Sequence, residues 1–521
     1  PVGKKKNIGI FCIIIVVQCL VILAWGTQKE RLNVDEMFTM EGAGQGGKGM
    51  QYWDRTDNFY GSEHTSQEFR EYMTVYHDEL LIYQGIDSVI DSLLHRNLYY
   101  TIINLAATAD PGNIPWRVGV GVNLCCFVLA QMALYLIAKE ICSDKGALCT
   151  VLLYGFSAGA ISTVLYVRCY MMLTMLALFL IYLDLRFVRT EKRWEKGLCL
   201  VGSAVLAVLC YRLHQFGIIL FTVITLLFVF YALVKRKKNC LLWMAAGYGI
   251  PALVGAGYII PQLKRLLTDN IAGIFYTSVK NMTLIQMLAQ MIKVLRIVAM
   301  HLFVNVGVMI LCFAVVLALY VKRKGGRRQE RADVFMLCLL TGVVAGYYCI
   351  LLLGGAVAWK YMSPVYPVIA LVFVMWVINV WNHSRKYNIA IMAGSVCLML
   401  SSYDTKHISE LFRGEAAIRE MLETNYHGVN GIMVHHEAAG ENWLYEAATL
   451  WPQESKVLVI QNKMLYEDEL CYNRTDDKIL LWLTIDYDNE KVIDKFKECV
   501  DYTDIELVLT TESLKIYECN K

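Results

Sequence analysis

The sequence predicts a polytopic α-helical membrane protein of about 11 transmembrane helices, followed by a small extracytoplasmic α/β domain. The 521 residues are 57% hydrophobic and 18% charged, and the mean hydropathy is +0.43, which is too apolar for an ordinary soluble domain. Apolar runs of spanning length recur through residues 1–403, whereas residues 404–521 alternate helical and strand patterns. We therefore expect a transmembrane domain over 1–403, with a long outer loop at 27–115, and an α/β domain over 404–521.

The apolar runs define the expected spans. The first run, "NIGIFCIIIVVQCLVILAWG", follows three lysines but is not followed by a small-x-small cleavage site, so we expect it to be retained as a span. The later runs lie near 117–138, 146–164, 170–188, 197–213, 215–234, 240–260, 297–320, 332–353, 364–381 and 388–403.

Basic residues cluster at every second connection between these runs, as in "RFVRTEKRWEK" and "KRKGGRRQER". Because Lys and Arg favour cytoplasmic loops, we expect the N-terminus in the cytoplasm and residues 27–115 and 404–521 on the outer face. The first outer loop contains amphipathic stretches, "SQEFREYMTVYHDELLIY" and "IDSVIDSLLHRNLYYTIINLAA", which predict juxtamembrane helices. The protein is thus expected in the cytoplasmic membrane, with membrane lipids and no nucleic acid among its partners.

The last part of the chain alternates helical patterns, such as "NEKVIDKFKECV", with short apolar runs. These runs, "GIMVH", "KVLVIQ", "KILLWLTI" and "IELVLTT", predict strands of a largely parallel sheet. Most of the 17 cysteines lie in apolar runs, where a thiol behaves as a small hydrophobe. Cys471, Cys499 and Cys519 lie in the water-soluble part, and their odd number and irregular spacing leave a disulfide among them open.

Two adjacent carboxylates, Asp35 and Glu36, follow the first span in "RLNVDEMFTMEGAG". Asn33 with Glu36 three residues later forms a capping-box variant, which predicts a helix starting at this point. That pattern does not require Asp35. A carboxylate at the outer membrane interface is also suited to act as a general base toward an acceptor hydroxyl or amine.

Cationic and tyrosine side chains also occur near the outer ends of several predicted spans. Arg168 and Tyr170 lie in "STVLYVRCYMML", Lys360 and Tyr361 lie in "AWKYMSPVYP", and Arg117 opens the second span. A snorkelling anchor explains each of them structurally. The functional alternative is binding of a phosphate or pyrophosphate, which a guanidinium suits especially well.

Two histidines, His95 and His214, are predicted near the outer surface, where a lone histidine is usually a hydrogen-bonding residue. Two strings resemble metal ligands. "DYD" at 486–488 lies in a tail too short for a soluble nucleotide-sugar transferase, and "HHE" at 435–437 follows a strand, so its side chains alternate between faces. The sequence therefore identifies no cofactor with certainty, and a requirement for a divalent cation stays possible.

Several stretches, in this order and on this side of the membrane, resemble the protein-O-mannosyltransferase-like branch of bacterial GT-C glycosyltransferases, which includes the lipid A aminoarabinose transferases. They cover roughly residues 1–385 and are "NVDEMFTMEGA", "HRNLYY", "WRVGVGVN", "VRCYMMLTMLALFLIYLDLR", "RLHQFG" and "KYMSPVYP". The resemblance implies an integral-membrane inverting transferase that takes a sugar from a polyprenyl-phosphate carrier on the outer face. It places the catalytic residue at Asp35, with Glu36 beside it.

The resemblance further implies that basic and tyrosine side chains hold the carrier phosphate. By position these are Arg168, Lys360, Tyr361 and Arg117, and the other cavity candidates are His95, Tyr99, Tyr100, Tyr170 and His214. The chain also departs from the family pattern. Arg96 and Asn97 replace a Pro-Pro pair, Lys360 replaces an Arg, and Tyr166 replaces a Glu, which affects the donor headgroup more than the reaction type.

The sequence therefore favours an outer-face glycosyltransferase that transfers a sugar from a lipid-phosphate donor to a lipid, a cell-envelope polymer or a protein. A transporter or flippase for a lipid-linked saccharide is an alternative, although such proteins tend to show paired halves and ionisable groups within spans. A third interpretation is a membrane scaffold whose C-terminal domain binds a partner.

Overall fold

The computed structural model describes most of the chain, and its contacts divide the chain into two compact units. The membrane unit comprises Pro1–Thr27, Ile90–Tyr99 and Gly119–Ser409, and the sheet unit comprises Gln28–Val89, Tyr100–Val118 and Glu410–Lys521. The structure describes residues 2–44, 60–76, 97–237, 240–245, 247–249, 283–322, 334–353, 357–380, 408–435, 442–461, 464, 476–484, 489–511 and 513–521. The predicted domain boundary at 403/404 lies outside these residues and stays a prediction.

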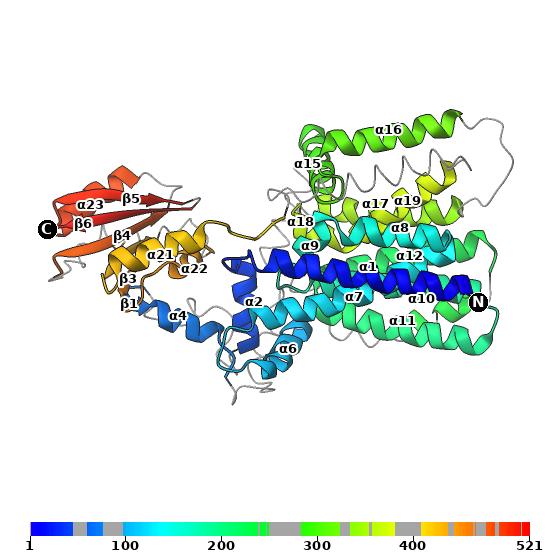
Figure 1. Ribbon diagram of the computed structural model, residues 1–521, viewed down its shortest axis with the longest axis horizontal. Helices are drawn as coiled ribbons and strands as arrows, with labels where there is room; N and C mark the ends of the chain where they lie inside the picture. The colour runs from blue at the N-terminus through cyan, green and yellow to red at the C-terminus, as the bar shows by residue number, and fades with distance from the viewer. Residues whose placement is uncertain are drawn as a thin grey trace. The chain divides into compact units, whose positions relative to one another are not determined.

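The membrane unit is a bundle of long apolar helices. They are α1 (Val2–Gly26), α7 (Trp116–Ile141), α8 (Asp144–Gly155), α9 (Ala158–Leu165), α10 (Tyr170–Arg189), α11 (Arg193–Leu213), α12 (Gln215–Val234), α15 (Leu284–Leu302), α16 (Val306–Lys322), α17 (Val334–Leu353), α18 (Trp359–Met362), η3 (Ser363–Val365) and α19 (Tyr366–Val380). Most of these helices run nearly side by side, while α15 runs across the direction of α16 (Figure 1).

Eight helices in the described part of the chain are long and apolar enough to cross a membrane, or nine when the bent pair α8 and α9 is taken as one span. Ser157 lies at the 59° bend of this pair, and its hydroxyl caps α9 by accepting from Ala160 N at 3.1 Å. The count of about 11 is not confirmed, because the predicted span at 388–403, and most of the one at 240–260, lie outside the described residues.

The expected single span at 297–320 is wrong. The structure divides it between α15 and α16, with the break at residues 303–305. Val304 adopts φ 77 at the break, a left-handed conformation that ends α15. Asn305 then starts α16 by accepting a hydrogen bond from Val308 N at 2.8 Å. Hydropathy did not reveal the break because both sides of it are apolar.

The sheet unit combines helices from the first loop with a six-stranded sheet. The elements from the first loop are α2 (Val34–Gly44), β1 (Ser62–Thr65), α4 (Ser66–Met73), α6 (Asn97–Ala106, which begins in the membrane unit) and η2 (Ala107–Ala109). Those from the end of the chain are α21 (Glu415–Tyr426), β2 (Gly431–His435), α22 (Asn442–Ala448), β3 (Lys456–Gln461), β4 (Lys478–Thr484), α23 (Asn489–Cys499), β5 (Asp504–Thr510) and β6 (Leu514–Asn520).

The sheet has the order β1-β3-β2-β4-β6-β5, and only its centre is parallel. β3, β2 and β4 pair in parallel, whereas β1, β6 and β5 pair antiparallel to their neighbours. The expectation of a largely parallel sheet is thus correct only for the centre, because the short β5–β6 connection cannot carry a parallel crossover. β1 comes from the first loop, and its Ser62 pairs with Val459, so the two distant segments share one sheet.

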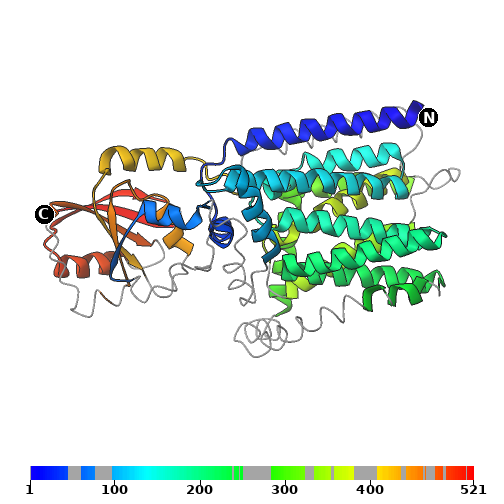
Figure 2. The same cartoon turned by 90° about the horizontal axis from the view of Figure 1, so that it is seen from below.

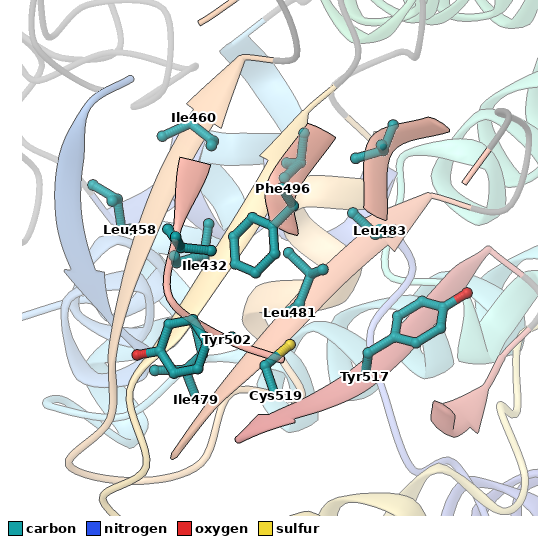
Figure 3. Close-up of a cluster of buried hydrophobic side chains, with 13 residues drawn as sticks. Ile432, Leu458, Ile460, Ile479, Leu481, Leu483, Phe496, Tyr502, Tyr517 and Cys519 are labelled. Carbon is teal, nitrogen blue, oxygen red and sulfur yellow. The ribbon is translucent and has the colours of Figure 1, made fainter. Parts of the chain in front are cut away.

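Alternating apolar residues of the strands form the core of this unit together with α23, as Figure 3 shows. Ile432, Leu481 and Phe496 are almost completely buried in this cluster. Helices α21 and α23 lie on opposite sides of the sheet (Figure 2), which gives a three-layer α/β arrangement. Cys519 is a free, fully buried thiol here, and burial raises its pKa to about 12. Cys471 and the side chain of Cys499 lie outside the described residues.

Candidate functional site

The predicted phosphate-binding segment around Arg168 lies in the membrane unit, in the short connection between α9 and α10. Its backbone is held by Asn123 of α7, whose side-chain amide donates to the carbonyl oxygens of Val164 at 3.1 Å and Tyr166 at 2.8 Å. The Tyr99 hydroxyl in turn donates to Asn123 Oδ1 at 2.9 Å. These bonds satisfy carbonyls at the end of α9 and fix the position where the chain turns.

Tyr166 and Tyr170 flank Arg168 in this connection, and their rings stack at 6.0 Å with an interplanar angle of 6°. Lys360 of α18 approaches the same place: its Nζ donates to the Tyr166 hydroxyl at 3.4 Å and lies 5.9 Å from the centre of the Tyr166 ring. The Lys360 ammonium is also 5.4 Å from the centre of the Tyr361 ring. Aromatic faces attract a cation, so the two rings help to hold the Lys360 ammonium in this position.

His214 joins the cluster from the junction of α11 and α12. Its Nδ1 accepts from Phe216 N at 3.2 Å and caps α12, so this nitrogen carries no proton. The His214 ring lies 5.6 Å from Tyr170, and the Phe216 ring lies 4.7 Å from Tyr361. The structure therefore brings four predicted residues, Tyr170, His214, Lys360 and Tyr361, into one aromatic and cationic cluster.

Besides Phe216, two more residues of this cluster were not identified from the sequence. Trp359 lies 5.3 Å from the Tyr166 ring, and His301 at the end of α15 stacks on Trp359 at 5.6 Å and 14°. Trp359 directly precedes Lys360, so the motif itself was a signal for it. His301 was a polar residue inside an apolar run, which indicates a specific contact.

The chemistry of this cluster suits the binding of an anion that is attached to a hydrocarbon chain. Arg168 is only 6% exposed, and its guanidinium carries a permanent positive charge that suits binding of an anion. Lys360 and Tyr361 are half-buried, so part of each side chain can be reached from outside. The aromatic rings around them offer apolar surface to a lipid. Among the described residues, no group of three His, Cys, Asp or Glu side chains is arranged to hold a metal ion.

The predicted carboxylates Asp35 and Glu36 lie in the sheet unit, at the start of α2. The capping box is confirmed: Asn33 Oδ1 accepts from Asp35 N at 2.9 Å, and Glu36 Oε2 accepts from Asn33 N at 2.7 Å. Glu36 is fully buried and also receives both hydrogen bonds of Lys29 Nζ, at 2.6 and 2.7 Å. Asp35 is half-buried. The two neighbouring carboxylates therefore have different environments.

The other predicted residues are distributed more widely. Tyr99 is buried against Asn123, Tyr100 packs its ring against Gly42 of α2, and Arg117 is exposed with its guanidinium 5.4 Å from the Trp116 ring. His95 and the "DYD" string lie outside the described residues.

In the "HHE" string, His435 is described and His436 and Glu437 are not. His435 Nδ1 is hydrogen-bonded to the Tyr60 hydroxyl at 2.8 Å, and the two rings stack at 5.4 Å.

The bundle of apolar helices and the α/β unit are those of a multi-pass membrane protein with an ArnT-like fold. The chain is similar to the crystal structure of ArnT from Cupriavidus metallidurans bound to undecaprenyl phosphate, with 11% identity, a TM-score of 0.56 and 98% of each chain covered. At this identity the likeness shows the fold, and the resemblance to the lipid A aminoarabinose transferase branch is confirmed at that level.

Two other solved structures are also similar to the chain, with lower TM-scores. The apo state of the same ArnT has 10% identity, covers 97% of each chain and gives a TM-score of 0.49. The Archaeoglobus fulgidus oligosaccharyltransferase in complex with zinc and sulfate has 12% identity and a TM-score of 0.37, with 71% of this chain and 54% of that chain covered. No protein-family model and no curated protein matches the chain.

Proposed function

We propose that the protein is a glycosyltransferase that takes a sugar from a polyprenyl-phosphate carrier at the outer face of the cytoplasmic membrane. One observation carries this proposal: nearly the whole chain has the fold of ArnT, whose crystal structure holds undecaprenyl phosphate. The cluster around Lys360 supports it, because Lys360, Tyr170 and Tyr361 from separate motifs lie together there, and Arg168 lies in the adjoining connection between α9 and α10. In this proposal the N-terminus is cytoplasmic and residues 404–521 are outside, as the distribution of basic residues between the loops favours.

In the proposed reaction, an acceptor oxygen or nitrogen attacks the anomeric carbon of the sugar from the face opposite the phosphate. The bond between that carbon and the phosphate oxygen breaks, and the electron pair leaves with the carrier phosphate. Asp35 removes the acceptor proton, and the sugar configuration inverts. Lys360 and Arg168 stabilise the charge that develops on the leaving phosphate, and the Tyr361 hydroxyl can donate to it.

Glu36 has a different proposed role from Asp35. Its carboxylate already accepts from Lys29 and from the backbone of Asn33, and it is fully buried, so it serves to build the start of α2. The proposed chemistry uses no resident cofactor. Transfer that stops when the purified enzyme is treated with EDTA would add a divalent cation to the reaction.

The test is an in vitro assay with purified protein and a labelled polyprenyl-phosphate sugar, in which free polyprenyl phosphate is measured. A transferase releases this product, whereas a flippase does not. The Asp35→Asn variant is expected to lower turnover by about 10²–10⁴-fold, because it removes the proton acceptor. Asp110→Asn is the matched control, since Asp110 is an exposed carboxylate of the same unit whose Oδ1 accepts from nearby Asn113 at 2.9 Å. Normal turnover by Asp35→Asn would refute the proposed role of Asp35.

A further inference from the structure

The helix that carries Asp35 is attached to the C-terminal part of the chain through its own capping residue. Asn33 Oδ1 accepts from Asp35 N at 2.9 Å, and Asn33 Nδ2 donates to Glu410 Oε2 at 2.8 Å. Glu410 therefore orients the side chain that holds the backbone of Asp35. A cap of this kind fixes both where a helix begins and how its first turn is rotated.

A second attachment lies two residues before the cap. The Arg31 guanidinium bridges two helices, with Nη2 3.3 Å from Glu415 of α21 and Nη1 3.4 Å from Glu446 of α22. Its carbon Cζ also lies 4.2 Å from the centre of the Phe412 ring. The planar guanidinium can make these three contacts at once, which a lysine ammonium cannot. The Arg31 side chain is only 8% exposed, so water screens the two ion pairs weakly.

The C-terminal partners in these contacts adopt an unusual backbone. Glu410 has φ 66 and Phe412 has φ 50, in the left-handed region that residues other than glycine rarely enter. Such conformations persist where the surrounding contacts determine them strongly. Glu410 contacts Asn33, Phe412 contacts Arg31, and the Leu411 carbonyl between them accepts from Glu30 N at 3.0 Å, so this segment packs against the residues that precede α2.

The body of α2 is held by the same part of the chain. Tyr445 of α22 is fully buried, and its hydroxyl donates to Glu41 Oε1 at 3.2 Å. The Tyr445 ring packs edge-on against Phe38 of α2 at 5.0 Å. The start of α2 and its side are thus both fixed by residues from 410 to 446.

We propose that the C-terminal α/β part of the chain positions the general base, and that Glu410 and Arg31 are positioning residues for Asp35. This inference rests on the proposed function of Asp35. A proton acceptor works only when its oxygen lies within hydrogen-bond reach of the acceptor group, so a displaced α2 slows the chemical step. The proposal therefore predicts a lower kcat with a donor KM close to that of the wild type.

The experiment uses the full chain in detergent or nanodiscs and compares four variants. Glu410→Ala and Arg31→Ala remove the two attachments. Glu410→Gln keeps an oxygen that accepts from Asn33, and Lys495→Ala removes an ordinary pair with Glu498 on α23 and serves as the matched control. The measurements are kcat, the KM for the donor, hydrogen–deuterium exchange of α2, and alkylation of Cys519 as a probe of folding.

The two alanine variants are expected to lower kcat at least fivefold, to change the donor KM less than twofold and to speed exchange in α2, with Cys519 still protected. Glu410→Gln and Lys495→Ala should behave like the wild type. Unchanged kcat in both alanine variants, or a loss of kcat together with loss of Cys519 protection, would overturn the proposal. A failure of the proposed function would give a different result, because the Asp35→Asn variant would then transfer sugar at the normal rate.

Discussion

The buried ion pair between Lys29 and Glu36 allows a quantitative test of how the start of α2 is built. The Lys29 ammonium lies 2.6 Å from Glu36 Oε1, and both side chains are 1% exposed or less. Lys29→Met removes the cation from a buried carboxylate, while the hydrogen bond from Asn33 N to Glu36 Oε2 is kept. Breaking a buried pair in this way costs about 3–5 kcal/mol.

The expected loss of stability is large enough to measure directly. One kcal/mol lowers the melting temperature of a domain of this size by about 2–4 °C, so Lys29→Met should lower that of the sheet unit by roughly 6–20 °C. Alkylation of Cys519 during a thermal scan reports this unit alone, because that thiol is fully buried in its core. The labelled peptide is quantified by mass spectrometry.

The double variant Lys29→Met with Glu36→Met provides the control. Replacing both members of a buried pair with apolar side chains of similar size is often neutral, so the melting temperature should return close to that of the wild type. A single Lys29→Met variant that melts at the wild-type temperature would refute the reasoning, since it would mean that Glu36 is not a charged, buried partner. Loss of transfer by Glu36→Gln without loss of stability would instead indicate a catalytic role for Glu36.

Two further predictions concern the phosphate cluster and the sheet. Lys360→Ala should raise the donor KM about 10–100-fold, because a charge-assisted hydrogen bond contributes about 1.5–3 kcal/mol. Tyr166→Phe keeps the ring beside Lys360 and should change the KM much less. An unchanged KM in Lys360→Ala would exclude contact between Lys360 and the phosphate. A hydrogen bond from Lys478 holds the pKa of Glu518 below its usual range. This pair therefore stabilises the fold at pH values above the unfolded pKa of about 4.3, and the stabilisation is lost as the pH falls through the lowered pKa of the folded state. Lys478→Ala should therefore destabilise by about 0.5 kcal/mol at pH 7, and the difference from wild type should disappear in thermal unfolding near pH 3; a difference that grows on acidification would contradict this.

Local patterns determined part of this protein. Hydropathy predicted the membrane bundle because a helix in lipid satisfies its own backbone and needs only apolar side chains. The capping box of Asn33 and Glu36 predicted the start of α2, since all its atoms lie within four residues. The strands β2, β3 and β4 were also predicted, from short buried runs between turn signals.

Contacts between distant residues decided the rest. Sidedness predicted only that Tyr170, His214 and Lys360 share a face, and the packing of separate helices brought them into one cluster around Tyr166. The pairing of β1 with β3 joins residues 62–65 to residues 456–459. No local pattern contains such a partner, because a strand or an ion pair gains stability only when the chain has closed a long loop and excluded water from both sides. The different environments of Asp35 and Glu36 have the same origin. The two carboxylates are adjacent in the sequence, but only the folded chain buries Glu36 against Lys29.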